Sequence, residues 1–412
     1  MKKFLHFIAV ANNPHYFVIC TLSFVLSFLL GVSAKAELKL IPLFDADVRL
    51  AYSSVLDSSG GYSGSGWIFF MPAMKLSESD YILPVFNVNV SLSERVIEEE
   101  TLFLKRMNNL GSLAYKHKFS KEMEGKVSFD TRYNFNMETK DEPFGKGLYD
   151  LYDLGVSGSV SFNSFLNEEP LPLTFGVKYY QRKYPNYNSL GATNSTVVSL
   201  TGGKETAPKD YNAEVFTVDY KTVLAHFYTE FSYNLVLKSF TDAYTRTSQG
   251  AISNTFRFDA VHYLSISGQL PITQGTAFGT DIDYILNASN GSIFDSDNLR
   301  FTDEYYSFGS LAFKPYYSFN LFGSLNTAVF YQVLVRNYKS RNARDSAGRY
   351  LPDTQSDLEN TIGVSFKYPV DKNFNLVGGI SYTGADSNMK YQDYVKYNYK
   401  IFGASAGVSM SF

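Results

Sequence analysis

Polar and apolar residues alternate with a period of two along the end of the chain, from Tyr394 to Phe412. Counted back from the last residue, the apolar positions are Phe412, Met410, Val408, Ala406, Ala404 and Phe402, and small or polar residues stand between them. A period of two places successive side chains on opposite faces of a strand. We therefore predict a terminal strand with one apolar face that ends on an aromatic residue.

The segment from Glu124 to Met137 shows the same alternation, with a charged or polar residue at every even position and, from 127 on, Val, Phe, Thr, Tyr or Met at every odd one. The pattern recurs in strands longer than the usual five or six residues, so we predict an all-β transmembrane antiparallel barrel with up-and-down topology. It has about sixteen strands, within a range of 14 to 18. They are expected near 43–56, 66–76, 81–94, 108–119, 124–137, 148–163, 171–183, 211–222, 224–240, 253–269, 274–288, 301–318, 323–338, 357–368, 373–385 and 393–412.

Short and long connections alternate along most of the chain. The short joins are near 120–122, 223, 271–273, 320–322 and 370–372; the long ones are near 138–147, 184–210, 241–252, 289–300, 339–356 and 386–392. Bacterial outer-membrane barrels have short periplasmic turns and long outer loops. An even strand number then puts both chain ends on the periplasmic side.

Two stretches are ambiguous. Trp67–Leu76 is apolar on both faces around Pro72, which fits an irregular strand or a segment tucked into the lumen. Ser93–Arg106 carries three consecutive acids and is interpreted as an outer loop with its flanking strand ends, with a short helix as the alternative.

The beginning of the chain has the features of a secretory signal peptide. Lys2 and Lys3 precede an apolar run from Tyr16 to Leu30, and Ala34-Lys35-Ala36 supplies a small-x-small cleavage pattern. We expect residues 1–36 to be removed and 37–412 to form the barrel without a separate domain; a retained membrane helix is the alternative. Cys20 lies within the apolar run, so the mature chain would contain no cysteine.

The charge and composition exclude some functions. The chain has 37 Lys and Arg against 40 Asp and Glu, and its mean hydropathy is −0.15. Removal of the three signal-peptide lysines leaves a mildly acidic protein, so we expect no nucleic-acid partner. The low hydropathy suits a barrel, in which every second residue faces water.

The terminal strand resembles the closing strand of Gram-negative outer-membrane β-barrels of the porin-like class. That resemblance implies that Phe402, Val408, Met410 and Phe412 form a signal for the barrel-insertion machinery. It also implies contact with outer-membrane lipid and lipopolysaccharide, and it raises a homotrimer as an option.

Residues with catalytic or metal-binding potential are sparse. His117, His226 and His262 are isolated on strands, and no nucleophile or zinc motif occurs. Glu98–Glu100 and the Asp281/Asp283 pair offer Ca²⁺ ligands, although a solvated loop and a polar wall explain them more simply. The basic residues between Lys339 and Arg349 are candidates for contact with lipopolysaccharide. We expect no enzyme activity, no cofactor and no metal.

Strand parity assigns the charged residues to the lumen. In addition to Asp45, Asp47, Arg49 and Lys116, the predicted lining residues are Lys126, Asp130, Arg132, Lys178, Arg182, Glu230, Arg257, Asp259, Asp281, Asp283, Arg336 and Lys367. Sixteen strands leave room for an aqueous channel in porins. The mixed charge predicts weak ion selectivity overall.

The favoured hypothesis is a passive channel for small hydrophilic solutes, with loop 184–210 either folded into the pore or lying outside it. A polymer-export barrel, or a non-conducting adhesin or receptor scaffold, is the alternative.

Overall fold

The chain forms one long-stranded β-barrel. A computed structural model describes residues 39–412 except for 56–59, 98–99, 138–141, 144, 167–168, 188–208, 225, 250, 296–299 and 392–396. The predicted signal peptide, 1–36, lies outside the described residues. The barrel strands are β1 (Lys39–Val55), β2 (Gly60–Lys75), β3 (Asp80–Ile97), β4 (Glu100–Lys118), β5 (Met123–Met137), β6 (Leu151–Leu166), β7 (Glu169–Lys183), β8 (Tyr211–Leu224), β9 (Phe227–Arg246), β10 (Ile252–Thr273), β11 (Thr276–Ser289), β14 (Phe308–Leu321), β15 (Leu325–Arg344), β16 (Tyr350–Pro369), β17 (Phe374–Ser387) and β18 (Tyr399–Ser411).

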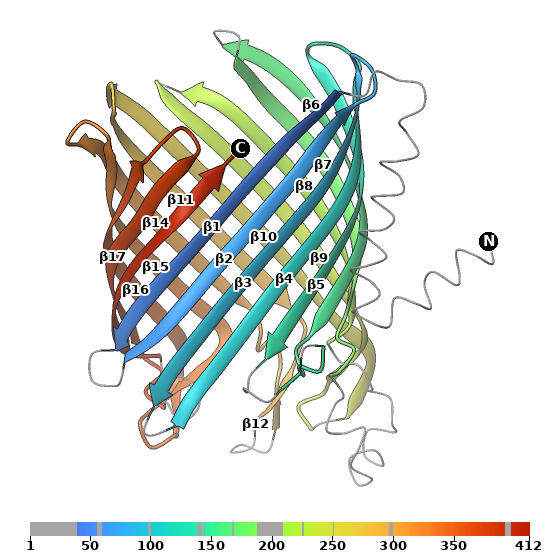
Figure 1. Ribbon diagram of the computed structural model, residues 1–412. Coiled ribbons are helices and arrows are strands. Elements are labelled where there is room, and N and C mark those ends of the chain that lie inside the picture. Colours follow the sequence, from blue (N-terminus) through green and yellow to red (C-terminus); the bar gives the residue numbers. More distant parts are fainter. Residues whose placement is uncertain are drawn as a thin grey trace.

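Each strand pairs antiparallel with its neighbours in the chain, and β18 returns to pair with β1, so the sheet closes into a barrel (Figure 1). The all-β up-and-down architecture and the sixteen barrel strands are confirmed, and each predicted strand corresponds to one of them. Two further strands, β12 (Ile293–Asp295) and β13 (Arg300–Thr302), form a small separate sheet in the connection from β11 to β14. Among the described residues, no helix is long and apolar enough to cross a membrane.

The closing seam joins the two ends of the sequence. Asp45 of β1 is opposite Ser411 of β18, and the pairing continues without a shift to Val55 and Ile401. Phe412 extends the seam, because its backbone N–H donates to the carbonyl of Phe44 at 2.8 Å and the N–H of Phe44 donates back at 3.1 Å. The Phe412 ring lies 6.1 Å from that of Phe44 and 5.9 Å from that of Phe374.

The two faces of the barrel wall differ in chemistry. Strand pairing places directly opposed residues on the same face, so the pairing register carries each face around the barrel. One face exposes large apolar side chains, among them Leu50 at 73 %, Val127 at 63 % and Val48 at 59 % exposed. The other face carries most of the charged residues. Burial of an apolar face against lipid is favourable and burial of charge is costly, so the apolar face is the outer one.

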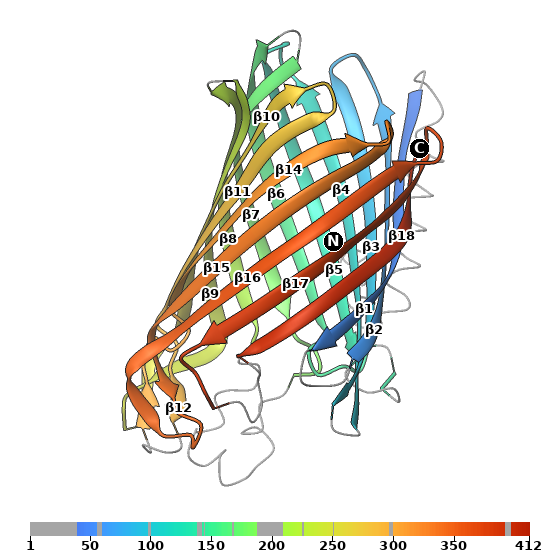
Figure 2. The same cartoon turned by 90° about the vertical axis from the view of Figure 1, so that its left-hand side faces the viewer.

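The two rims are unequal. In Figure 1 the carboxy terminus lies at the upper rim, whereas β12 lies beyond the lower rim. Figure 2 shows the same arrangement from the side, with steeply inclined strands forming a continuous wall. Tight turns lie at the rim of the carboxy terminus; one of them contains Gly275, whose φ of +90° is a backbone conformation that suits glycine.

Several predicted loops are shorter than expected, because the strands extend further. Within the stretch 93–106, predicted as an outer loop with flanking strand ends, β3 and β4 pair up to Ile97 and Glu100, and only 98–99 lie outside the described residues. The described part of this stretch is strand, and the alternative of a short helix is wrong. The long connections predicted at 241–252 and 339–356 are largely strand, with gaps only between Arg246 and Ile252 and between Arg344 and Tyr350.

The predicted stretch Trp67–Leu76 is strand up to Lys75. β2 pairs without a break with β1, whereas its pairing with β3 has no partners for Met71–Ala73, around Pro72, so the alternative of an irregular strand holds. Trp67 and Phe69 share the face of Asp47 and Asp45, which explains the lack of alternation.

Candidate functional site

The interior wall of the barrel is the candidate site. Following the register from strand to strand places all twelve residues selected by parity on one face, opposite to the apolar one. Examples of opposed pairs on this face are Arg132 with Asp153, Lys221 with Glu230, and Asp281 with Lys314. The register thus gives the location of these side chains, while their role as pore lining stays a prediction.

A cluster of ion pairs lies on β5, β6 and β7. The Nζ of Lys178 donates to the carboxylate of Asp130 at 2.8 Å, and the hydroxyl of Ser112 donates to the same carboxylate at 2.6 Å. Arg182 holds Asp153 with two hydrogen bonds of 2.7 Å each, and Arg132 is 4.0 Å from that carboxylate. A two-pronged arginine–carboxylate contact fixes the orientation of both groups.

A second cluster surrounds Asp259, which is only 3 % exposed. Arg257 donates two hydrogen bonds to its carboxylate, at 3.0 and 2.8 Å, and Ser289 adds a third at 2.5 Å. The Arg257 guanidinium also stacks on aromatic rings, at 4.4 Å from the centroid of Phe240 and 3.9 Å from that of Tyr306. This arrangement satisfies the buried charge and holds the arginine against the wall.

Two further pairs lie nearer the rim of the carboxy terminus. Glu230 is bonded to Lys221, and Asp281 is 3.9 Å from Lys314. Among the described residues, the remaining four of the twelve have no ion pair or hydrogen bond from their side chains: Lys126, Asp283, Arg336 and Lys367.

The alternation pattern did not identify several charged residues on the interior face that contact other interior side chains. They include Asp153, Asp219, Lys221, Lys238, Lys314, Asp357 and Glu359, each of which shares the interior face by register. The signal was present in the sequence, since Lys238 has the parity of Glu230 on one strand and Asp153 has the parity of Ser157 on another. The prediction of mixed interior charge is strengthened by these residues, because both signs are represented among them.

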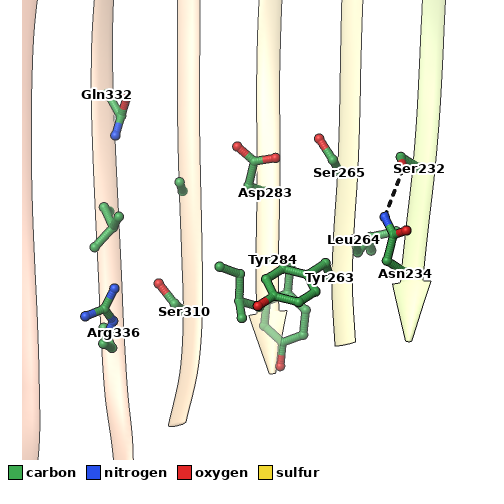
Figure 3. A pocket seen from close by; sticks show the side chains of 13 residues that line it. Ser232, Asn234, Tyr263, Leu264, Ser265, Asp283, Tyr284, Ser310, Gln332 and Arg336 are labelled. Atoms are coloured by element: carbon green, nitrogen blue, oxygen red, sulfur yellow. Dashed lines mark hydrogen bonds between the residues drawn. The ribbon is translucent and has the colours of Figure 1, made fainter. Parts of the chain in front are cut away.

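A recess of about 450 Å³ opens in the interior wall across β9, β10, β11, β14 and β15 (Figure 3). Its polar lining comes from five neighbouring strands: Ser232, Asn234, Tyr263, Ser265, Asp283, Ser310, Gln332 and Arg336. Ile285, Ala312 and Leu334 supply apolar surface between them. The recess therefore combines two charged groups of opposite sign with uncharged hydrogen-bonding groups.

At the rim opposite the carboxy terminus, here called the far rim, the loops contact one another. The Asp150 side chain is fully buried and accepts hydrogen bonds from the backbone N–H of Asn136 at 2.6 Å and of Gly147 at 3.2 Å. Burial, opposed by these hydrogen bonds and aided by the charge of Glu142, raises the pKa of Asp150 to about 6. Asn186, from the next loop, donates to the carbonyls of Gly145 and Gly147, so the two loops are joined.

Both described ends of loop 184–210 are anchored. Asp210 accepts a hydrogen bond from the N–H of Tyr184 at 2.8 Å and lies 3.0 Å from the Nζ of Lys183. The Nζ of Lys209 lies over the rings of Tyr149 and Tyr187, at 4.8 and 4.7 Å from their centroids. Burial, together with the nearby charge of Arg257, lowers the pKa of Lys209. The middle of this loop, 188–208, is outside the described residues, and so is the predicted choice between a folded-in and an external loop.

The basic residues between Lys339 and Arg349 are engaged within the protein. Lys339 lies 2.8 Å from Glu304, and Arg349 lies 2.7 Å from Asp345. The Arg341 guanidinium stacks on three tyrosines, Tyr305, Tyr338 and Tyr397, at 5.0 to 5.6 Å. Their use in contact with lipopolysaccharide stays a prediction.

His117 and His262 of the described residues have partners other than a serine nucleophile. The Nδ1 of His117 is 2.8 Å from Asp80, but the nearby Ser77 and Ser79 hydroxyls donate to that carboxylate and not to the imidazole. His262 hydrogen-bonds Tyr233 at 2.8 Å on the outer face. Within the described ranges no three His, Cys, Asp or Glu side chains converge on a metal-sized site. Glu98 and Glu99 of the acidic run lie outside those ranges.

Comparison with known proteins yields similarity of fold only. No protein-family model matches the chain, and no curated protein sequence is significantly similar to it. Solved outer-membrane proteins do match over most of their length. OccD3 (OpdP) of Pseudomonas aeruginosa is 8 % identical, with a TM-score of 0.47, over 92 % of this chain and 94 % of that one.

Two other matches are of the same kind. OmpF of Salmonella typhi, solved with daunomycin, is 12 % identical with a TM-score of 0.44, over 91 % of this chain and 98 % of that one. OmpT of Vibrio cholerae, described as a trimer form, is 9 % identical with a TM-score of 0.45, over 92 % and 100 % of the two chains. At this distance the ligands and assembly of these proteins say nothing about the present chain.

Proposed function

We propose that this protein is an outer-membrane channel through which small hydrophilic solutes diffuse passively. The observation that supports the proposal most directly is the closed sixteen-strand wall with an apolar outer face and a charged inner face. Barrels of this strand number leave an aqueous lumen in porins. Solutes would move down their concentration gradients past the lining residues, and no residue would act in chemistry.

Ion pairing within the wall sets the expected selectivity. Lys178 with Asp130, Arg182 with Asp153, and Arg257 with Asp259 are neutralised in pairs on one side of the barrel. Opposite charges at short distance produce a local field and little net charge. We therefore expect weak selectivity between small cations and anions.

The first test is the conductance of single refolded barrels, without residues 1–36, in a planar bilayer. Stable steps on the nanosiemens scale, in line with large porin-type pores, support the proposal. A correctly folded barrel that gives no steps contradicts it and favours a gated exporter or a surface scaffold.

Asp130→Asn is the sharper variant of this test. The substitution removes the carboxylate that neutralises Lys178, so the reversal potential in a salt gradient should shift toward anion selectivity. Asn373→Asp, in a turn at the rim, is a control that adds a charge outside the wall. An unchanged reversal potential in Asp130→Asn, with conductance intact, would show that this part of the wall does not line the conducting path.

The setting of the channel is part of the proposal. The carboxy terminus and the start of β1 lie at the rim with tight turns, which we assign to the periplasm. The outer partners would be outer-membrane lipid and lipopolysaccharide, and Phe402, Val408, Met410 and Phe412 would be read by the insertion machinery. A homotrimer stays a prediction, and light scattering of the detergent-purified protein distinguishes it from a monomer.

A further inference from the structure

Of the four interior charges without an ion pair or hydrogen bond among the described residues, two, Arg336 and Asp283, line the same recess. Arg336 has Asp357 directly across the strand pair, yet the Asp357 carboxylate takes its hydrogen bonds from Gln355 at 2.8 Å and Ser387 at 2.6 Å. The Nε of Arg336 is buried without a hydrogen-bond partner, and its guanidinium stacks on Phe308 at 5.2 Å. The buried Nε faces the wall, so only the terminal nitrogens of the guanidinium are available to a solute.

Asp283 is the complementary case. Its neighbours across the strands are Ala312 and Ser265, neither of which carries charge. The nearby Lys314 lies instead against Asp281, at 3.9 Å. Asp283 is exposed to the lumen, and no described residue forms an ion pair with it.

Both residues line the 450 Å³ recess, where Figure 3 shows them on strands separated by the strand of Ser310. Arg336 is on β15 and Asp283 on β11, with β14 between them. Two strand spacings and one step of two residues put their Cα atoms about 12 Å apart. The Asp283 carboxylate is exposed on β11, and the Arg336 guanidinium lies beside Phe308 of β14. Ser310 and Tyr263 are among the uncharged groups that line the same recess.

We propose that this recess is a binding site for a short zwitterionic peptide on its way through the lumen. The carboxylate of the solute would accept from the Arg336 guanidinium, and its ammonium would lie at Asp283. An extended peptide of two or three residues spans about 7 to 10 Å. The two Cα atoms are about 12 Å apart, so the Arg336 and Asp283 side chains have only a few ångströms to cover. The proposal rests on the lumen being the solute path, and it adds the class of solute.

Saturation-transfer NMR on the refolded full barrel in detergent tests the binding directly, because it detects weak binding and does not need a conducting pore. Glycylglycine is the probe. N-acetylglycylglycine, which lacks the ammonium, and glycylglycine amide, which lacks the carboxylate, are the matched analogues. We expect glycylglycine to bind more tightly than either analogue by about 5-fold, the upper end for one partly screened ion pair.

Arg336→Gln and Asp283→Asn should each reduce glycylglycine binding by a similar factor, about 5-fold. Lys367→Gln, which removes an interior charge outside the recess, should leave it unchanged. The exchanged variant Arg336→Asp with Asp283→Arg should bind the peptide in the reverse orientation. Heat-dependent migration on gels checks that every variant is folded.

Equal binding of glycylglycine and its two blocked analogues, or no binding by the folded protein, overturns the zwitterion site. Either result leaves the conductance measurement standing, so the failure of this site is distinguishable from the failure of the channel proposal.

Discussion

Asp150 shows how one side chain joins two loops at the far rim. It is fully buried, and it accepts hydrogen bonds from the backbone of its own loop while Asn186 of the next loop caps the same turn. Its pKa is raised from 3.8 to about 6, mainly by burial. The folded protein thus binds a proton at Asp150 more tightly than the unfolded chain does.

The stability of this loop pair should therefore depend on pH. A folded-state pKa above the unfolded one gives a stabilising contribution that is complete below about pH 4 and is lost as the pH rises through about 6. The shift corresponds to about 3 kcal/mol at most. We expect amide exchange in Gly145–Asp150 to be slower at pH 4.5 than at pH 7.5, after correction for the intrinsic rates.

Asp150→Asn is the matched control for that experiment. The amide carries no charge at either pH, so the difference in corrected exchange should disappear. A difference that persists in the variant would assign the pH dependence to another group.

At this scale the sequence indicated which residues face inward but not what they touch. Parity alone placed Asp130 and Lys178 on one face, because alternation is a local property. Their 2.8 Å contact depends on how β5 and β7 are registered through β6, which no local pattern specifies. The unpaired state of Arg336 was equally hidden, since it results from the hydrogen bonds that Gln355 and Ser387 make to Asp357.

The element that closes the barrel is β18 with Phe412. Phe412 adds two backbone hydrogen bonds to Phe44 and ring contacts to Phe44 and Phe374, all at the last position of the chain. We predict that deleting Phe412 lowers the yield of folded barrel in the outer membrane several-fold, because the seam loses its last pair of bonds and the proposed insertion signal loses its final residue.

The measurement is the fraction of heat-modifiable protein in isolated outer membranes. Phe322→Ser is the matched control, because Phe322 is 94 % exposed in a turn at the same rim and far from the seam. A normal yield after deletion of Phe412 would remove it from the assembly signal.

Strand existence was predictable, and strand ends were not. The alternation is clear where one face meets lipid, as along β5 and β18. Near the rims, outside the part of the wall that contacts lipid, both faces of a strand meet water or other loops. Polar residues then occupy both faces, and the sequence of the strand end is like that of a loop. This is why the connections at 241–252 and 339–356 were predicted too long, although β9 and β15 continue to Arg246 and Arg344.

For the whole molecule, the assignment of inside and outside can be tested at two adjacent residues. Leu50 is on the outer face and is 73 % exposed, whereas Ala51 shares the inner face with Arg49. Leu50→Lys should lower the free energy of unfolding in lipid vesicles by about 2–4 kcal/mol if it lies near the bilayer midplane. Ala51→Lys should change it by less than about 1 kcal/mol, because the lysine enters a polar interior.

Denaturant titration of both variants in the same vesicles provides the comparison. Equal losses of unfolding free energy in the two variants would show that Leu50 and Ala51 do not face lipid and lumen respectively. The count of about sixteen strands followed from the sequence because each strand is a local pattern. The closing pairing of β1 with β18 followed only from the structure, because it joins residues at opposite ends of the chain, such as Asp45 and Ser411.

The pairing of β1 with β18 also constrains the order in which the strands of the barrel can pair. Every other neighbouring pair in the wall can form a hairpin as soon as its second strand is made, but β1 waits for β18, the last strand to emerge. Until then β1 carries a free edge of unpaired backbone groups, the kind of edge that recruits other strands and leads to aggregation. A cell that produces this chain must therefore shield an open-edged precursor for the whole interval between synthesis of the first strand and docking of the last.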